Sequence, residues 1–185
     1  MNQRDNFFRR ITFQFFILII SFSLFSCSQY QIADSPKIKK SRTWIIMPLE
    51  NNSNQPLATE KVEAILSATL FSYGVDAQMY PKTIATDLVS ILDNQSRKLQ
   101  ASDWLIAQEA TYVISGSVNE WHYKSGLDGE PAVGITLELI DKVSKTVLWK
   151  ATGSRSGWGR ESLTGAGQTV IEELIDGLEI PEKED

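Results

Sequence analysis

The strongest structural signal in the chain is the stretch Val133-Gly134-Ile135-Thr136-Leu137-Glu138-Leu139-Ile140. Apolar side chains alternate with small or polar ones along most of it, and this two-residue period predicts a β-strand with one strongly apolar face. We expect the strand to span 132–141. Strand patterns also occupy 111–123 and 146–154, and the connection at 142–145 is short enough for a turn. Three consecutive strands joined in this way predict an antiparallel meander.

Strand and helix patterns alternate on the N-terminal side of the meander. Strands are expected at 44–49 and 75–80, with a helix from Ala58 to Gly74 between them. Helical patterns follow at 82–92 and 95–109, and a last helix follows the meander. This order predicts the α+β class: a three-strand antiparallel meander plus the N-terminal strands in one sheet, packed with helices as an α/β sandwich. One domain is expected over 43–180.

The first 26 residues differ chemically from the rest. Seven of the eight phenylalanines lie there, and an apolar run at 11–25 follows Arg4, Arg9 and Arg10. A basic start and a short apolar run predict a lipoprotein-type signal peptide over 1–26. An apolar helix of this length spans about 22 Å, short of the ~30 Å hydrocarbon core, which argues against a stable transmembrane helix.

The apolar run ends in Leu24-Phe25-Ser26-Cys27, which resembles the bacterial lipoprotein box, where the cysteine becomes the acylated N-terminus. Cys27 is the only cysteine in the chain, so lipidation, with palmitate among the acyl groups, explains a thiol that no disulfide can use. Several acyl chains on one residue anchor stably. In Gram-negative lipoproteins, a residue other than aspartate directly after the cysteine usually resembles an outer-membrane address. Because Ser28 follows Cys27, we expect the protein on the periplasmic face of the outer membrane. A free thiol beside an ordinary cleavage site is the alternative.

Charge divides the remaining chain into a basic segment and an acidic body. Residues 27–42 are polar and carry four Lys and Arg against one Asp, so we expect a lipidated tether whose cations lie near headgroups or are simply solvated. Residues 43–185 carry 11 Lys and Arg against 21 Asp and Glu, a net charge of −10, and residues 181–185 form an acidic tail. So acidic a body disfavours nucleic-acid binding; it suits a cationic partner, or the charge merely keeps the protein soluble.

The sequence contains no combination of residues that we would assign to a catalytic site. His122 is the only histidine, which excludes a metal site of several histidines, and no Gly-x-Ser-x-Gly motif accompanies it. Asp128 and Glu130 are candidates for a glycosidase pair or are simply solvated loop acids. We therefore expect a protein that is not an enzyme and uses no metal and no cofactor.

Two glycine-rich loops stand out, at 124–131 and at 154–163. In the second, Trp158 lies between Gly157 and Gly159, so little neighbouring chain is available to bury it. An exposed tryptophan beside a lipid anchor suits the membrane interface. Packing of Trp158 against its own domain or a neighbouring subunit is the alternative.

The loops and their flanking strands also carry a family resemblance. Residues 121–134 (WHYKSGLDGEPAVG) and 154–163 (SRSGWGRESL) resemble the PelC family, the outer-membrane lipoproteins of Pel exopolysaccharide export in biofilm formation, and 44–58 is similar too. The resemblance implies a non-enzymatic homo-oligomer, a dodecameric ring beneath the outer membrane that associates with a PelB-type β-barrel. It also implies that Trp158 contacts the membrane, and that Asp128, with Glu130 nearby, guides the cationic polysaccharide towards the porin.

A second functional hypothesis is a regulatory lipoprotein that binds a cell-envelope enzyme, of the peptidoglycan-synthase activator type. Such a protein needs a long tether to cross the periplasm. The 16 residues of 27–42 reach at most about 55 Å when extended, which favours a domain that stays near its membrane. A periplasmic carbohydrate hydrolase is a third hypothesis, and the lack of an assigned acid/base pair disfavours it.

Overall fold

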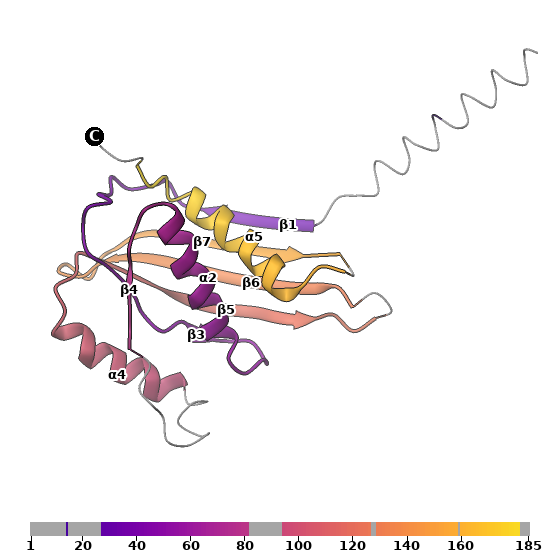
Figure 1. Ribbon diagram of the computed structural model, residues 1–185, viewed down its shortest axis with the longest axis horizontal. Coiled ribbons are helices and arrows are strands. Elements are labelled where there is room, and N and C mark those ends of the chain that lie inside the picture. Colours follow the sequence, from indigo (N-terminus) through magenta and orange to yellow (C-terminus); the bar gives the residue numbers. More distant parts are fainter. Residues whose placement is uncertain (1–13, 15–26, 82–93, 127–128, 159, 182–185) are drawn as a thin grey trace, which may run out of the picture.

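The computed structural model describes residue 14 and residues 27–81, 94–126, 129–158 and 160–181 (Figure 1). The predicted signal peptide, the 82–92 stretch and most of the acidic tail lie outside these residues. The elements are β1 (Cys27–Ile32), β2 (Trp44–Ile46), β3 (Glu50–Asn51), α2 (Ala58–Ser72), β4 (Gln78–Met79), α4 (Asn94–Ile106), β5 (Tyr112–Tyr123), β6 (Pro131–Asp141), β7 (Val147–Ser156) and α5 (Leu163–Asp176).

Within the described residues, seven strands form one sheet in the order β1-β7-β6-β5-β2-β4, with β3 paired to β5. The predicted meander is confirmed: β5 pairs antiparallel with β6, and β6 pairs antiparallel with β7. The alternation that predicted it marks the core, because Val133, Ile135, Leu137 and Leu139 are fully buried on one face. A register shift between Val118 and Glu120 places a bulge in β5.

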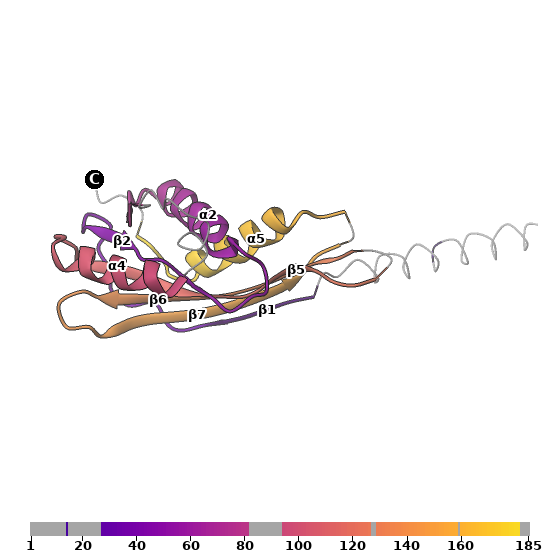
Figure 2. The same ribbon diagram turned by 90° about the horizontal axis from the view of Figure 1, so that it is seen from below.

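Helices α2 and α5 cover the apolar face of the sheet, as Figure 2 shows. Three tryptophans, Trp44, Trp121 and Trp149, are buried in this core. The last helix begins with a cap, because the backbone N–H of Gly165 donates to Ser162 Oγ at 3.0 Å. Helix α4 contributes Ala101 to a smaller cluster with Ile45 and Val113. The α+β class expected from the sequence is therefore confirmed.

Some element boundaries differ from the expectations. The strand expected at 75–80 is limited to β4, and the loop expected after residue 49 begins with the short strand β3. The helix expected at 95–109 is α4, which ends three residues earlier, at Ile106. These differences are small. The expectations rest on apolar positions, and the fold buries those positions in its core.

The expected tether at 27–42 is wrong, because this segment is folded onto the domain. Strand β1 pairs antiparallel with β7 from Cys27↔Ser156 to Ile32↔Ala151. Beyond β1, the Ser35 hydroxyl donates to the carbonyl of Leu178, and Ile38 is buried. The described part of the fold therefore includes the basic segment from residue 27 onwards. The sequence from 27 to 185, which contains this segment, has a net charge of −7 rather than the −10 of 43–185.

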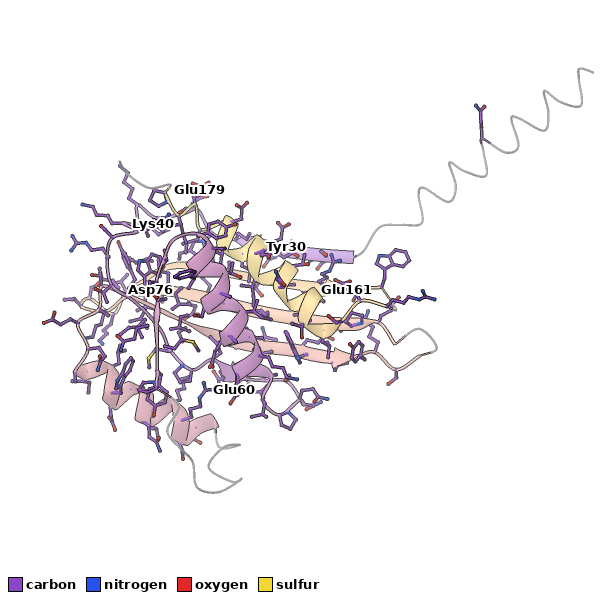
Figure 3. All side chains as sticks on the ribbon, viewed as in Figure 1. Tyr30, Lys40, Glu60, Asp76, Glu161 and Glu179 are labelled. Carbon is purple, nitrogen blue, oxygen red and sulfur yellow. The ribbon has the colours of Figure 1, made fainter. Side chains whose placement is uncertain are left out.

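The position of the basic segment also differs from the expectation. Strand β1 leads away from Cys27, so the lysines that follow it lie towards the other end of the sheet. Figure 3 shows Lys40 at the end opposite Glu161, near Glu179. The cations of 37–42 are therefore not beside Cys27, so they do not lie where the sequence placed them, near headgroups at a lipidated Cys27.

Candidate membrane-contact site

Three segments meet where β1 begins (Figure 1). The register places Cys27 opposite Ser156. The Lys124 Nζ atom donates to Ser156 Oγ at 2.6 Å, and the Gly157 N–H donates to the Pro131 carbonyl at 2.9 Å. We call this part of the molecule, formed by Cys27 and by residues 124–126, 129–131 and 156–158, the anchor end. The sequence predicted its members one by one, and the antiparallel pairing of β1 with β7 brings them together.

Trp158 lies at the anchor end with 44% of its surface exposed. Tyr123, at the end of β5, is 51% exposed, and its hydroxyl accepts a hydrogen bond from the Leu163 N–H at 3.2 Å. Two large aromatic side chains are therefore partly open to the surroundings at the end of the sheet where β1 begins, although β6 and β7 lie between Tyr123 and β1. Aromatic rings with one apolar side and one polar group suit the headgroup region of a bilayer.

An ion pair fixes the backbone around Trp158. Arg155 forms a forked contact with Glu161, with Nε 3.2 Å from Oε1 and Nη2 3.3 Å from Oε2. Glu161 Oε2 also accepts the Trp158 N–H at 3.3 Å, and the Glu161 N–H donates to the Trp158 carbonyl at 2.8 Å. The remaining arm of the fork, Arg155 Nη1, donates to Ser28 Oγ at 3.3 Å. This pair was not predicted, because residues six apart in a loop give no sequence signal.

The predicted acidic residues of the 124–131 loop divide into two cases. Glu130 lies at the anchor end with its side chain 43% exposed, and its Oε2 is 3.9 Å from Lys124 Nζ. Its backbone carbonyl accepts the Lys124 N–H at 2.8 Å, which closes the base of the loop. Asp128 lies outside the described residues. The polymer-guiding role expected for both stays a prediction.

His122 is exposed on the sheet, with Nε2 3.7 Å from Glu120 Oε1. The described part of the chain contains no group of three or more His, Cys, Asp or Glu side chains arranged to hold a metal ion. Among the same residues, no helix combines the length and the apolar character that crossing a bilayer would require.

Acidic side chains gather on the second half of α5, away from the anchor end. Glu172, Glu173 and Asp176 are exposed there, and the Tyr73 hydroxyl donates to Asp176 Oδ1 at 3.4 Å. Partial desolvation raises the pKa of Tyr73, and the nearby carboxylates add to this rise. Because α5 starts beside the Trp158 loop and leads away from it, the molecule separates this acidic patch from the anchor end.

A second ion pair lies inside the fold. Glu63 on α2 is buried, pairs with Arg97 on α4, and accepts the Leu49 N–H on Oε1 at 2.9 Å. Glu60 Oε1 adds a contact to Arg97 at 3.4 Å. Burial raises the pKa of the Glu63 carboxyl, and the hydrogen bond and charge of Arg97 act in the opposite direction. The pair joins α4 to α2 and to the loop that follows β2.

Two solved structures are similar to this chain over most of its length. A PelC dodecamer from Paraburkholderia phytofirmans is 30% identical, covers 84% of this chain and 100% of its own, and has a TM-score of 0.70. A leucine-to-methionine variant of that dodecamer, in another crystal form, is also 30% identical with the same coverage and a TM-score of 0.68. No family model matches the chain, and no curated protein matches its sequence.

Proposed function

Because the chain belongs to the PelC family, we propose that it is a lipid-anchored subunit of a ring that assists export of Pel exopolysaccharide. Both similar structures are dodecamers, which supports a homo-oligomer. The proposed ring lies on the periplasmic face of the outer membrane, beneath a PelB-type β-barrel. It guides a cationic polysaccharide and makes or breaks no covalent bond.

The observation that carries this proposal is the position of Cys27 as the first residue of β1, at the same end as the exposed Trp158. With lipid on Cys27, no flexible segment separates the anchor from the sheet. The anchor end must then lie at the bilayer surface, where the indole of Trp158 can enter the interfacial region. Such an attachment favours a ring held flat against its membrane.

The charge of the folded unit supports guidance of a cationic polymer. A net charge of −7 per subunit, repeated around a ring, produces a strong negative field, and a concave opening focuses it. Each exposed contact between a sugar amine and a carboxylate is worth about 0.2–1 kcal/mol, weak enough to let the polymer move on. The exposed acids of α5 lie away from the anchor end and would therefore face incoming polymer from the periplasm.

The regulatory hypothesis fits the fold less well. A regulator of a cell-envelope enzyme must reach across the periplasm from its lipid anchor. Here residues 27–32 are a sheet strand, and the Ser35 hydroxyl donates a hydrogen bond to the carbonyl of Leu178, just after α5. The segment that would have to extend across the periplasm is part of the domain. This leaves a role close to the membrane that holds the lipid anchor.

Replacing Asp128 with lysine tests the guiding role. Reversal of this charge should lower secreted Pel polysaccharide by about threefold or more, because local fields of this kind change capture rates by tenfold or more. Secreted polymer is measured in cells that express the variant at the parent level. Asp103→Lys, the same change at an exposed position on α4, serves as the matched control and should export normally. Parent-level export by Asp128→Lys would contradict the role.

A further inference from the structure

Arg155 connects the anchor strand to the loop that carries Trp158. It lies on β7, opposite Ser28 in β1 and opposite Val133 in β6. Its guanidinium group donates in two directions, to Ser28 Oγ at 3.3 Å and to both carboxylate oxygens of Glu161. Ser28 directly follows the cysteine that would carry the lipid. One side chain thus contacts both the lipid-bearing strand and the residue that holds the Trp158 backbone.

The contact between Arg155 and Glu161 is suited to hold the Trp158 backbone in one position. Arg155 and Glu161 are only 19% and 21% exposed, so water competes little with their forked interaction. Gly157 leaves room for the Glu161 carboxylate, because a β-carbon at Gly157 would overlap it. A planar guanidinium bonded on both edges has one orientation, whereas a lysine ammonium at the same place would lack the fork. The Trp158 backbone is therefore held relative to β1.

We propose that Arg155 and Glu161 are positioning residues that fix the depth of Trp158 relative to the lipid on Cys27. The inference rests on the proposed membrane contact of Trp158 and adds how that contact is set. The clamp, meaning Ser28, Arg155 and Glu161, holds the indole ready at the surface when the acyl chains insert. Without the clamp, the loop samples other conformations, and the population able to insert Trp158 falls.

The experiment uses the processed, lipidated protein in phosphatidylcholine vesicles that contain brominated phospholipid. The readout is the bromine-quenched tryptophan emission that is lost in Trp158→Phe, which isolates Trp158 from the other four tryptophans. Zwitterionic lipid is chosen so that removal of a cation has no direct electrostatic effect on binding. Arg155→Met and Glu161→Gln should each reduce this quenching about three- to tenfold, because it follows the population of the competent loop conformation.

Three further variants separate the effects of the Ser28 hydrogen bond, of the forked geometry and of losing a cation. Ser28→Ala breaks only the link to β1 and should give a smaller loss. Arg155→Lys keeps the charge without the fork and should remain well below the parent. Lys150→Met removes an exposed cation from the same strand, where its Nζ lies 2.6 Å from Glu138, and should match the parent. Circular dichroism of each variant verifies that the fold is retained.

Two results would overturn the inference, and they are distinguishable. If Trp158→Phe shows the same quenching as the parent, Trp158 does not enter the bilayer, and the proposed membrane contact and the clamp both fail. If Trp158→Phe loses quenching while folded Arg155→Met and Glu161→Gln keep it, the membrane contact stands and the clamp is wrong. Full recovery in Arg155→Lys would also reject the clamp, since charge alone would then suffice.

Discussion

Replacing Gly116 with alanine is expected to cost at least about 4 kcal/mol of folding free energy, the range reserved for severe disruption of a core. Gly116 lies in β5 opposite Leu137, with a φ of 156° that L-residues rarely adopt. A β-carbon there would overlap the backbone carbonyl oxygen of Thr136 on the neighbouring strand. Backbone in the middle of a sheet cannot move aside as a flexible side chain can, so the meander itself would have to separate.

The measurement is urea unfolding at one fixed subunit concentration, because assembly makes apparent stability depend on concentration. Gly126→Ala is the matched control. A β-carbon at Gly126 would have no atom within 4 Å, and its expected effect is within about 0.5 kcal/mol. If Gly116→Ala is as stable as Gly126→Ala, the described register of β5 with β6 is incorrect.

Removing Arg97 is expected to cost about 3–5 kcal/mol, because it leaves a buried carboxylate without its charged partner. The side chain of Glu63 is 2% exposed and that of Arg97 is 14% exposed. In Arg97→Met, the hydrogen bond from the Leu49 N–H is the favourable contact that remains described for the Glu63 carboxylate. The charge of Glu60 repels this carboxylate. The double variant Glu63→Gln/Arg97→Met removes the buried charge and should recover most of the loss.

Lys98→Met is the control for this prediction. Its ion pair with Glu50, at 3.6 Å, is more than half exposed on both sides, and its loss should change stability by no more than about 1 kcal/mol. Equal effects of Arg97→Met and Lys98→Met would show that the Glu63–Arg97 pair does not hold α4 in place.

The cost of Arg97→Met should also depend on pH. Burial raises the pKa of Glu63 above its unfolded value of about 4.3, so its contribution favours folding when the carboxyl is protonated and is lost as pH rises through the folded pKa. Arg97 lowers this pKa, and its removal therefore raises it further. The deficit of the variant is expected to be largest near neutral pH and to shrink towards pH 5. A deficit independent of pH would mean that lost packing, rather than the unpaired charge, causes it.

The sequence predicted the elements whose signal is local. The alternation at 132–141 identified the central strand, and the apolar spacing in α2 and α5 identified the helices that cover it. Strand β1 was missed, because Tyr30 and Ile32 are its only large apolar residues among serine and glutamines. Such a strand is defined by its partner β7, more than a hundred residues away, and polar composition alone made the segment look like a tether.

In the candidate site, too, features with a local sequence signal could be predicted and long-range contacts could not. Cys27 and Trp158 were predicted as site residues from the lipoprotein motif and from two flanking glycines, and their roles stay predictions. Their location at one end of the sheet could not be predicted, since it follows from the antiparallel pairing of β1 with β7. The contacts of Arg155 with Ser28 and of Arg97 with Glu63 join residues 127 and 34 positions apart, and their value depends on burial that only the folded chain creates.

The depth of the two ends of the sheet relative to the bilayer shows whether the protein is held to its membrane by the Cys27 end. With Cys27 lipidated, a cysteine introduced at Ser125, in the loop after β5, or at Val143, in the turn after β6, is the sole free thiol for a spin label. The two positions are at opposite ends of a strand about 36 Å long. Attachment through Cys27 should place a Ser125 label at the headgroups and a Val143 label in water beyond reach of the lipid. Equal depths, or a Val143 label closer to the bilayer, would contradict it.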